Sequence, residues 1–437
     1  MASVFNKENN DTEEKALAIL VGLDTGRSDN FEHSMEEMES LIEACDMLVA
    51  GQIVQHLDHP NAGTYLGKGK IDEVRDFAID QEADLVIFED NLSPAQLKNL
   101  QQILDIEVWD RTNLILEIFS RRAKTREARL QVEVAYLQYM LPRLTGMWQH
   151  LGRQGGGSGS MSNKGVGETQ IELDRRHIRK RIGELKRELE DVKKTRDVQR
   201  AGRSKGNLPS VALVGYTNAG KSTIMNHLLM RNGAEDEKQV FEKDMLFATL
   251  DTSIRHVNVE GNKDFLLSDT VGFIENLPHD LIKAFRSTLE EAANADLLLI
   301  VLDASDPNWK LHKKVTEDTL VELGAGDIER IYVMNKADKI DSEAKIPRVR
   351  EDSIWISAKK EIGFEELISM ITLRVYKDNE LIEGIIPYSR GDLINLLHEK
   401  ANVFTEEYRG DGIFIKADCP KSVAGAVKNA IEKTTSR

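Results

Sequence analysis

The sequence predicts an α/β protein in four parts. Short apolar runs alternate with helical patterns over residues 16–110 and again over residues 208–376, which indicates two mostly parallel sheets with covering helices. Between them lies a basic segment with apolar residues at helical spacing. The predicted parts are an N-terminal α/β domain (1–112), a long antiparallel helical hairpin (113–205), a second α/β domain (206–376) and a small C-terminal α+β domain (377–437).

Three apolar runs in the N-terminal domain read as strands, and three amphipathic patterns read as helices. The strands are 17–23, 83–88 and 106–109, and the helices are 34–48, 71–81 and 93–104. Gly67-Lys-Gly-Lys70 precedes one of these helices. It is either a phosphate-binding turn or an ordinary turn with solvated lysines, and the second interpretation is preferred.

The helical hairpin is predicted from two sets of regularly spaced apolar residues. The first helix should end near Pro142, and its apolar positions are Leu130, Val134, Leu137 and Leu141. The second should begin at Thr169, which starts a capping box with Glu172, and its apolar positions are Ile178, Ile182, Leu185, Leu189 and Val192. The glycine-rich stretch 152–160 predicts a flexible tip, and residues 201–206 predict a linker.

The C-terminal domain is predicted to begin at about Asn379 with the order strand, helix, hairpin, helix. Arg409-Gly-Asp-Gly412 has the composition of the hairpin turn.

Charge is unevenly distributed along the chain. The formal net charge of −16 argues against a nucleic-acid partner, yet residues 120–205 contain 21 Lys and Arg and only 10 Asp and Glu. This segment therefore carries +11 and the remainder −27. Such asymmetry indicates either a local footprint for a polyanion or a solvated helical surface.

The composition also limits the setting in which the protein works. The two cysteines, Cys45 and Cys419, are far apart, and no Cys/His spacing indicates a zinc site. No apolar run approaches the ~20 residues of a membrane span, and the polar N-terminus lacks the apolar core of a signal peptide. We therefore expect a cytoplasmic protein without a membrane span, and we expect it to be a monomer.

A phosphate-binding loop follows the predicted strand 211–214. G-x-x-x-x-G-K-S stands between this strand and a predicted helix, the context that the motif requires. Glycines let backbone N–H groups surround phosphate oxygens, and the helix dipole favours negative charge. Lys221 should reach the β- and γ-phosphates, and the Ser222 hydroxyl should bind Mg²⁺. The predicted contacts of this loop are Gly215, Tyr216, Thr217, Asn218, Ala219, Gly220, Lys221, Ser222 and Thr223.

Two later segments select the base. The predicted strand 331–334 leads into Asn335-Lys-Ala-Asp338, the N-K-x-D pattern. A carboxylate at Asp338 can accept from guanine N1–H and N2–H₂, a donor pair that adenine lacks. Asn335 should brace the loop, the stem of Lys336 should cover the ring, and the Ala358 N–H should face guanine O6. The predicted base contacts are Asn335, Lys336, Asp338, Ser357, Ala358 and Lys359.

The segment between these loops predicts the nucleotide switch. Asp269-Thr-Val-Gly272 follows a strand, so Asp269 should hold Mg²⁺ through water and the Gly272 N–H should sense the γ-phosphate. Thr249 is predicted to close on Mg²⁺ and the γ-phosphate, with Thr252 or Ser253 as alternatives. The predicted contacts here are Phe247, Ala248, Thr249, Asp269, Thr270, Val271 and Gly272; the metal ligands are Ser222, Thr249 and Asp269; and the catalytic residues are Lys221, Thr249 and Gly272.

Phe273 follows the D-x-x-G motif at a position where a water-positioning glutamine is often found. Phenylalanine can neither orient nor deprotonate water. GTP hydrolysis by the isolated protein should therefore be slow, and another group must position the water. Packing of Phe273 at a strand end is compatible with the same kinetics.

The order of these motifs resembles that of the HflX family of translation-factor-class GTPases, and the resemblance extends over essentially the whole chain. The further segments that carry it are Tyr65–Lys70, Val108–Arg111, Arg126–Gln131, Gly152–Gly157, Gly167–Gln170 and Asp174–Arg176. Two details depart from the family pattern: the tip reads Ser158-Gly-Ser-Met-Ser-Asn-Lys164, and the switch region has Asp251-Thr-Ser where Asp-Pro-Thr is more usual.

The resemblance implies a GTPase that binds the large ribosomal subunit and splits stalled or idle ribosomes, with the hairpin tip directed toward the peptidyl-transferase region. It also suggests ATP binding by the N-terminal region, where no complete phosphate motif is present. A basic hairpin suits binding to RNA phosphates, and the candidate RNA contacts are Arg153, Arg175, Arg176 and Arg179, each alternatively a solvated helix residue. Two other functions are possible: a regulatory GTPase that acts on a non-ribosomal protein partner, and a metabolic nucleotide enzyme such as a small-molecule kinase. Asn335 and Asp338 count against the second, because a phosphoryl-transfer enzyme needs no guanine-selecting loop.

Overall fold

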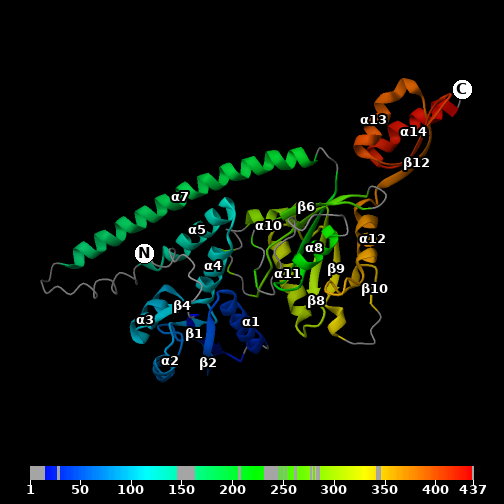
Figure 1. The fold of residues 1–437 in the computed structure, drawn as a ribbon. Helices are drawn as coiled ribbons and strands as arrows, with labels where there is room; N and C mark the ends of the chain where they lie inside the picture. The colour runs from blue at the N-terminus through cyan, green and yellow to red at the C-terminus, as the bar shows by residue number, and fades with distance from the viewer. Residues whose placement is uncertain are drawn as a thin grey trace. The chain divides into compact units, whose positions relative to one another are not determined.

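The structure is a computed structural model that describes residues 15–26, 30–144, 163–204, 208–230, 246–247, 250, 253–259, 263–275, 278, 281, 286–340 and 346–435. The chain divides into two compact units, Met1–Leu189 with Pro278–Ala284, and Glu190–Leu277 with Phe285–Arg437 (Figure 1).

A four-stranded parallel sheet forms the centre of the N-terminal part. Its strand order is β2-β1-β3-β4, with β1 (Leu17–Asp24), β2 (Leu48–His56), β3 (Leu85–Phe88) and β4 (Glu107–Trp109). Parallel neighbours need crossover connections, and these are α1 (Phe31–Ala44), α2 (Lys68–Asp80) and α3 (Pro94–Leu104). The predicted α/β architecture of this part is therefore confirmed.

The prediction missed β2 and extended the first helix to residue 48. β2 is an edge strand in which only Ile53 is buried, so its apolar alternation is weak. Helix α1 instead ends at Ala44, and Asp46 takes a left-handed conformation with φ +56° that turns the chain toward β2. The second predicted helix begins earlier than expected, because Gly67 is its N-cap and the residues after it form its first turn.

Two successive helices replace the single long helix that was predicted before Pro142. Helix α4 (Arg111–Arg122) packs against β3, β4 and α1. The helix is interrupted at residues 123–125. The Thr125 hydroxyl then caps α5 (Arg126–Met140) by accepting from Ala128 N at 3.1 Å. A capping threonine favours a new helix start over continuation.

Helix α7 (Asn163–Ser204) is 42 residues long, and it runs antiparallel to α5. Arg126 pairs with Glu188 at 2.9 Å and Glu133 pairs with Arg181 at 2.8 Å, so rising residue numbers in one helix meet falling numbers in the other. The predicted antiparallel hairpin is present. Its predicted limits were wrong: α7 starts before Thr169 and continues to Ser204, so neither the capping box nor Gly202 ends the helix.

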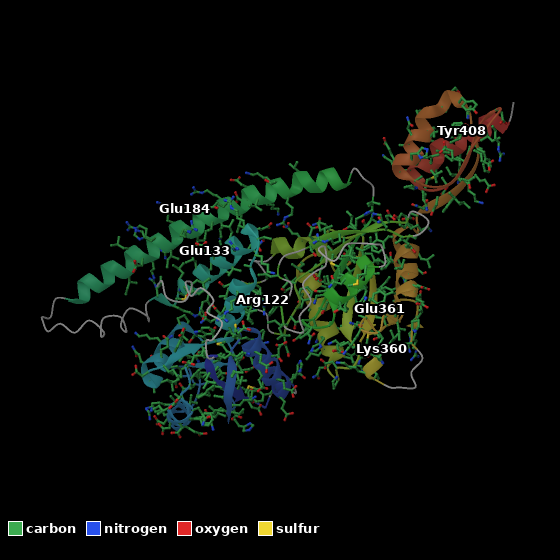
Figure 2. The ribbon with its side chains drawn as sticks, viewed as in Figure 1. Arg122, Glu133, Glu184, Lys360, Glu361 and Tyr408 are labelled. Atoms are coloured by element: carbon green, nitrogen blue, oxygen red, sulfur yellow. The ribbon has the colours of Figure 1, made fainter. Side chains whose placement is uncertain are left out.

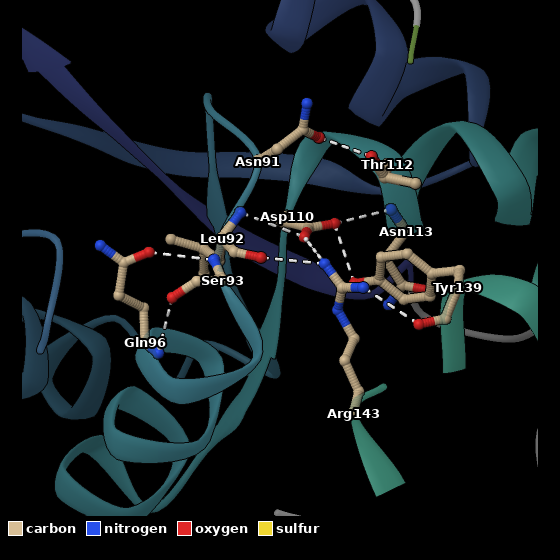
Figure 3. A network of polar contacts seen from close by, with 9 residues as sticks. All are labelled: Asn91, Leu92, Ser93, Gln96, Asp110, Thr112, Asn113, Tyr139 and Arg143. Atoms are coloured by element: carbon tan, nitrogen blue, oxygen red, sulfur yellow. Dashed lines mark hydrogen bonds and ion pairs between the residues drawn. The ribbon is translucent and has the colours of Figure 1, made fainter. Parts of the chain in front are cut away.

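A buried carboxylate joins the end of α5 to the N-terminal sheet (Figure 3). Asp110 is 0% exposed and caps α4, accepting from Asn113 N at 2.9 Å and from Leu92 N at 3.2 Å. Tyr139 OH donates to it at 2.9 Å, and Arg143 Nη2 lies at 3.3 Å. Arg143 also donates to Leu92 O at 2.9 Å and stacks 3.7 Å from the Tyr139 ring centre. The residues that lead into the tip segment are thus held by the loop that follows β3.

The second α/β domain contains a seven-stranded sheet in the order β10-β11-β9-β8-β5-β7-β6. Its strands are β5 (Ser210–Gly215), β6 (Ser253–Val257), β7 (Phe265–Asp269), β8 (Leu297–Asp303), β9 (Arg330–Asn335), β10 (Arg348–Val349) and β11 (Ser353–Trp355). Edge strands β6 and β10 are antiparallel and the inner strands parallel. The helices are α8 (Lys221–Met230), α10 (Arg286–Ala293), α11 (Trp309–Glu322) and α12 (Phe364–Val375).

The C-terminal part has the predicted order of elements. A three-stranded antiparallel sheet, β12-β14-β13, consists of β12 (Asn379–Ile386), β13 (Asn402–Arg409) and β14 (Gly412–Pro420), together with helices α13 (Gly391–Lys400) and α14 (Lys421–Thr435). The β13–β14 turn lies at residues 410–411, next to the exposed Tyr408 labelled in Figure 2. Among the helices of the described residues, none is long and apolar enough to cross a membrane.

The Asp110 network predicts a stability effect. In Asp110→Asn, one acceptor oxygen replaces two, and the new N–H₂ group faces groups that themselves donate. We expect the free energy of unfolding of the N-terminal part to fall by about 2–4 kcal/mol. Native-state hydrogen exchange of β1 and β3 in the full chain measures this, with Asp76→Asn, an exposed acid on α2, as control. Unchanged exchange in the Asp110 variant would contradict the prediction.

Candidate nucleotide site

The phosphate-binding loop connects β5 to α8 and requires glycine at both ends. Gly215 has φ +148°, and a Cβ there would lie 2.2 Å from Val301 O. Gly220 has φ +95°, and a Cβ there would lie 2.2 Å from Asn335 Nδ2. Both positions therefore exclude any side chain on steric and conformational grounds. Asn218, at φ +56°, takes the left-handed turn between them.

Lys221 lies in the interior of this loop and is 7% exposed. Its Nζ donates to Gly215 O at 3.0 Å and to Tyr216 O at 2.8 Å. Burial lowers the pKa of this lysine to about 8, although the charge of Asp269 opposes the shift. The site thus contains a desolvated ammonium group, which an anionic phosphate would stabilise strongly.

The glycine of the D-x-x-G motif lies directly against this lysine. A Cβ on Gly272 would be 3.1 Å from Lys221 Nζ and 2.8 Å from Thr217 Cγ2. The backbone at this position can therefore approach the phosphate-binding loop only because it carries no side chain. The motif and the loop, 50 residues apart in sequence, form one surface.

Ser222 and Asp269 meet at the end of β7. The Ser222 hydroxyl donates to Asp269 Oδ2 at 2.8 Å, and Asp269 is 0% exposed. A hydroxyl and a carboxylate at this distance are the hard oxygen donors that Mg²⁺ takes together with phosphate oxygens and water. The adjacent Thr270 hydroxyl donates to Leu213 O at 2.7 Å and so faces the sheet instead.

Phe273 is joined to the phosphate-binding loop by an isolated parallel bridge to Tyr216. Its N–H donates to Gly215 O at 3.1 Å, its carbonyl accepts from Thr217 N at 2.8 Å, and its side chain is 1% exposed. Two residues later, Glu275 N donates to the Tyr216 hydroxyl at 2.7 Å, and the Tyr216 ring stacks on His312 with 3.8 Å between ring centres. In this structure the Phe273 side chain is a packing group.

The base-selecting loops converge on Asn335. Its Nδ2 donates to Ala219 O at 2.9 Å, and its Oδ1 accepts from Ala358 N at 2.9 Å. One side chain thus joins the phosphate-binding loop, the N-K-x-D loop and the Ser357–Lys359 loop. The Ala358 N–H, which the sequence argument assigns to guanine O6, already donates to Asn335, so an O6 contact would have to share that hydrogen bond.

Asp338 is oriented by its neighbours. The Ser357 hydroxyl donates to Asp338 Oδ1 at 2.7 Å, and Lys360 Nζ lies 3.8 Å from Oδ2. The Ser357 hydrogen bond, followed by nearby lysine charges, holds the pKa of Asp338 below its ordinary value. The carboxylate is therefore ionised at neutral pH, as an acceptor for two base donors must be.

The remaining predicted residues fall into two groups. Phe247 is 2% exposed with φ +54°, Val271 is 6% exposed, Lys359 is exposed and Thr223 is half-buried. Ala248 and Thr249 lie outside the described residues, as does the alternative Thr252. The other alternative, Ser253, begins β6 and directs its hydroxyl to Met225 Sδ at 3.6 Å.

Sequence reasoning did not single out Asp303, which ends β8 and contacts Lys336 Nζ at 2.8 Å. The available signal was an acid at the carboxyl end of an inner strand, where loops of a parallel sheet gather. Tyr216 was predicted as a nucleotide contact, but its links to Glu275 and His312 were not anticipated.

Three family models match this chain in succession. Residues 32–120 match a model described as GTP-binding GTPase N-terminal, residues 122–203 one described as GTP-binding GTPase middle region, and residues 210–336 one described as 50S ribosome-binding GTPase. A crystal structure of SsGBP in complex with GDP is 26% identical, covers 83% of this chain and 99% of its own, and has a TM-score of 0.46.

Relatives of known family match over almost the full length. GTPase HflX of Caldanaerobacter subterraneus subsp. tengcongensis is 42% identical over 96% of this chain and 94% of its own. GTPase HflX of Escherichia coli K12 is 40% identical over 90% of this chain and 91% of its own. The resemblance noted in the sequence is thereby confirmed: this chain belongs to the HflX family and is a GTP-binding P-loop GTPase.

Proposed function

We propose that this GTPase acts on the large ribosomal subunit and uses its nucleotide cycle to split or rescue stalled or idle ribosomes. The observation that carries the proposal is a basic, exposed face on α7, the helix that follows the glycine-rich segment. The family resemblance and the match of residues 210–336 to a 50S ribosome-binding family support it further.

Positive charge on α7 is higher at residues 174–187, near the middle of the helix, than at residues 188–197. Residues 174–187 contain seven Lys and Arg against two Asp and Glu, whereas residues 188–197 contain three against four. Arg176, Arg179, Lys186 and Arg187 are exposed, and within the described part of the chain none of them forms an ion pair. The pairing arginines, Arg126 and Arg181, are used between the helices instead. This face suits contact with RNA phosphates. Arg153 lies outside the described residues.

The nucleotide site supplies the switch. We assign phosphate binding to Lys221, γ-phosphate sensing to the Gly272 N–H, and Mg²⁺ to Ser222 and Asp269, with Thr249 as the switch threonine. When bound, Mg²⁺ would neutralise charge on the β- and γ-phosphates. Gly272 contacts Lys221, so a γ-phosphate at the ammonium group would act directly on the segment that continues into Phe273.

Hydrolysis by this chain alone should be slow. The Phe273 side chain is buried and apolar, so it offers nothing to orient a water molecule. A partner that supplies or orders such a group would raise the turnover rate. The proposal places that role on the ribosome.

Cosedimentation with purified large ribosomal subunits tests the partner. We expect pelleting with a non-hydrolysable GTP analogue but little with GDP, weaker binding at the higher of two salt concentrations, and GTP turnover raised about 10³-fold or more by the subunits. Arg179→Glu should weaken binding about three-fold or more, and Lys194→Glu on the other half of α7 should not. Absence of pelleting in both nucleotide states would refute the ribosomal proposal in favour of a non-ribosomal protein partner.

Base selection is tested by Asp338→Asn. The amide replaces an acceptor with a donor, so GTP affinity should fall roughly 10²-fold or more and xanthosine triphosphate should become the better ligand. Competition binding of the two nucleotides measures the change. Glu361→Gln, an exposed acid two residues after Lys359 (Figure 2), is the matched control. Retention of full guanine preference in Asp338→Asn would overturn the base-loop assignment.

The pKa of Lys221 predicts how GDP affinity depends on pH. With a pKa of about 8 in the free protein, the ammonium is lost as pH rises above that value, whereas a bound phosphate would keep it charged. Binding therefore takes up a proton, and affinity should be constant below pH 7 and about five-fold weaker by pH 8.6. Calorimetry in buffers of different ionisation enthalpy, below the pH at which guanine N1–H ionises, measures the uptake. If GDP bound without proton uptake, Lys221 would not be a charged phosphate ligand with a lowered pKa.

A further inference from the structure

We infer that Asp303 is a positioning residue for guanine recognition, which holds the ammonium group of Lys336 so that the lysine stem is fixed across the base site. The inference deepens the proposed nucleotide site and rests on the assignment of Lys336 to the base.

The sheet places Asp303 beside the N-K-x-D loop. Asp303 is the last residue of β8 and is paired in register with Asn335, the last residue of β9. Ala304 N donates to Asn335 O at 2.8 Å, so the two strands stay together past their ends. Lys336 therefore leaves β9 directly next to the Asp303 side chain.

The two carboxylate oxygens of Asp303 have separate partners. Oδ2 lies 2.8 Å from Lys336 Nζ, and both side chains are about one-fifth exposed, at 20% and 22%. Oδ1 accepts from Ser305 N at 2.9 Å and from the Ser305 hydroxyl at 2.6 Å. The Ser305 contacts fix the carboxylate, and the fixed carboxylate in turn fixes the lysine.

Charge state and backbone conformation agree with this role. Burial works to raise the pKa of Asp303, but hydrogen bonds from Lys336 and Ser305 outweigh it and hold the pKa below its ordinary value. Lys336 has φ +57°, a left-handed conformation that is unfavourable for a residue with a side chain. A lysine anchored at both its backbone and its ammonium group has lost its rotamer freedom before the base arrives, so binding need not supply that ordering.

Asp303 also keeps Lys336 away from the base-selecting acid. Lys336 stands two positions before Asp338, and an unanchored ammonium there could neutralise the carboxylate that guanine needs. In the structure Asp338 instead accepts a hydrogen bond from Ser357 and pairs with Lys360. Asp303 thus pairs with Lys336 and Asp338 with Lys360, so Lys336 does not neutralise the carboxylate assigned to the base.

A double-mutant cycle tests the inference in the full chain. Asp303→Ala and Lys336→Met should each weaken GDP binding about three- to ten-fold, a range that allows for their partial exposure. The double variant should be no weaker than the worse single variant, because both remove the same interaction. GTP turnover at saturating nucleotide should fall by a smaller factor than GDP affinity in both variants, so the loss should appear mainly in KM. Asp318→Ala, an exposed acid on α11, is the matched control and should leave GDP affinity unchanged.

Asp303→Asn separates positioning from a general structural role. It retains an oxygen for Ser305 but loses the charge that holds Lys336, so it should fold normally and lose GDP affinity by an intermediate factor. Fully additive losses in the cycle, or an Asp303→Asn protein with wild-type affinity, would overturn the inference. If Lys336→Met has no effect while Asp338→Asn switches to xanthosine nucleotides, the inference fails and the base site stands. If Asp338→Asn keeps guanine selectivity, the base-site assignment itself fails.

Discussion

The side-chain amide of Asn335 is the interaction on which the nucleotide site depends. It donates to the phosphate-binding loop and accepts from the loop at Ala358, so one residue sets the distance between the phosphate and base ends of the site. It can do so because β8 alone separates β9 from β5, and because Gly220 leaves room for its Nδ2. The glycine at position 220 of the phosphate-binding loop is thus required by this amide as well as by phosphate binding.

A second junction links the nucleotide to the rest of the chain. Gly272 lies so near Lys221 that a Cβ there would be 3.1 Å from its Nζ. Phe273 pairs with the phosphate-binding loop through its backbone, and Glu275 N donates to the Tyr216 hydroxyl. A phosphate that takes Lys221 Nζ away from Gly215 O and Tyr216 O must therefore alter the surroundings of Gly272. The same close packing leaves Phe273 buried, and its apolar side chain offers no group that could activate water.

The N-terminal part uses a comparable device for a different purpose. Asp110 gathers donors from the loop after β3, from the start of α4 and from the end of α5, all around one buried carboxylate. The hairpin therefore begins from a fixed base, and its two helices are held in register by ion pairs. The exposed arginines for which we propose RNA contacts lie on the second of these two helices.

Local sequence patterns were enough to predict the chemistry of the loops and the type of most elements. Glycine, lysine, serine and aspartate at fixed spacing after apolar strands predicted the phosphate-binding loop, the D-x-x-G turn and the N-K-x-D turn, because each depends on neighbours within a few residues. Periodicity likewise predicted the antiparallel hairpin and the order of elements in the C-terminal part. Periodicity did not predict β2, because its apolar alternation is weak. It also did not predict the true start of α7, because a capping box is only a local preference that a continuing helix can override.

Which of these groups contact one another could be learned only from the folded chain. Asn335 bridges Ala219 and Ala358, and Asp303 pairs with Lys336. Both contacts follow from the strand order, which places β11, β9, β8 and β5 side by side. Hydrophobic periodicity records whether a strand is buried but not which strand lies beside it. Contacts between strand ends far apart in sequence are therefore decided by the sheet as a whole.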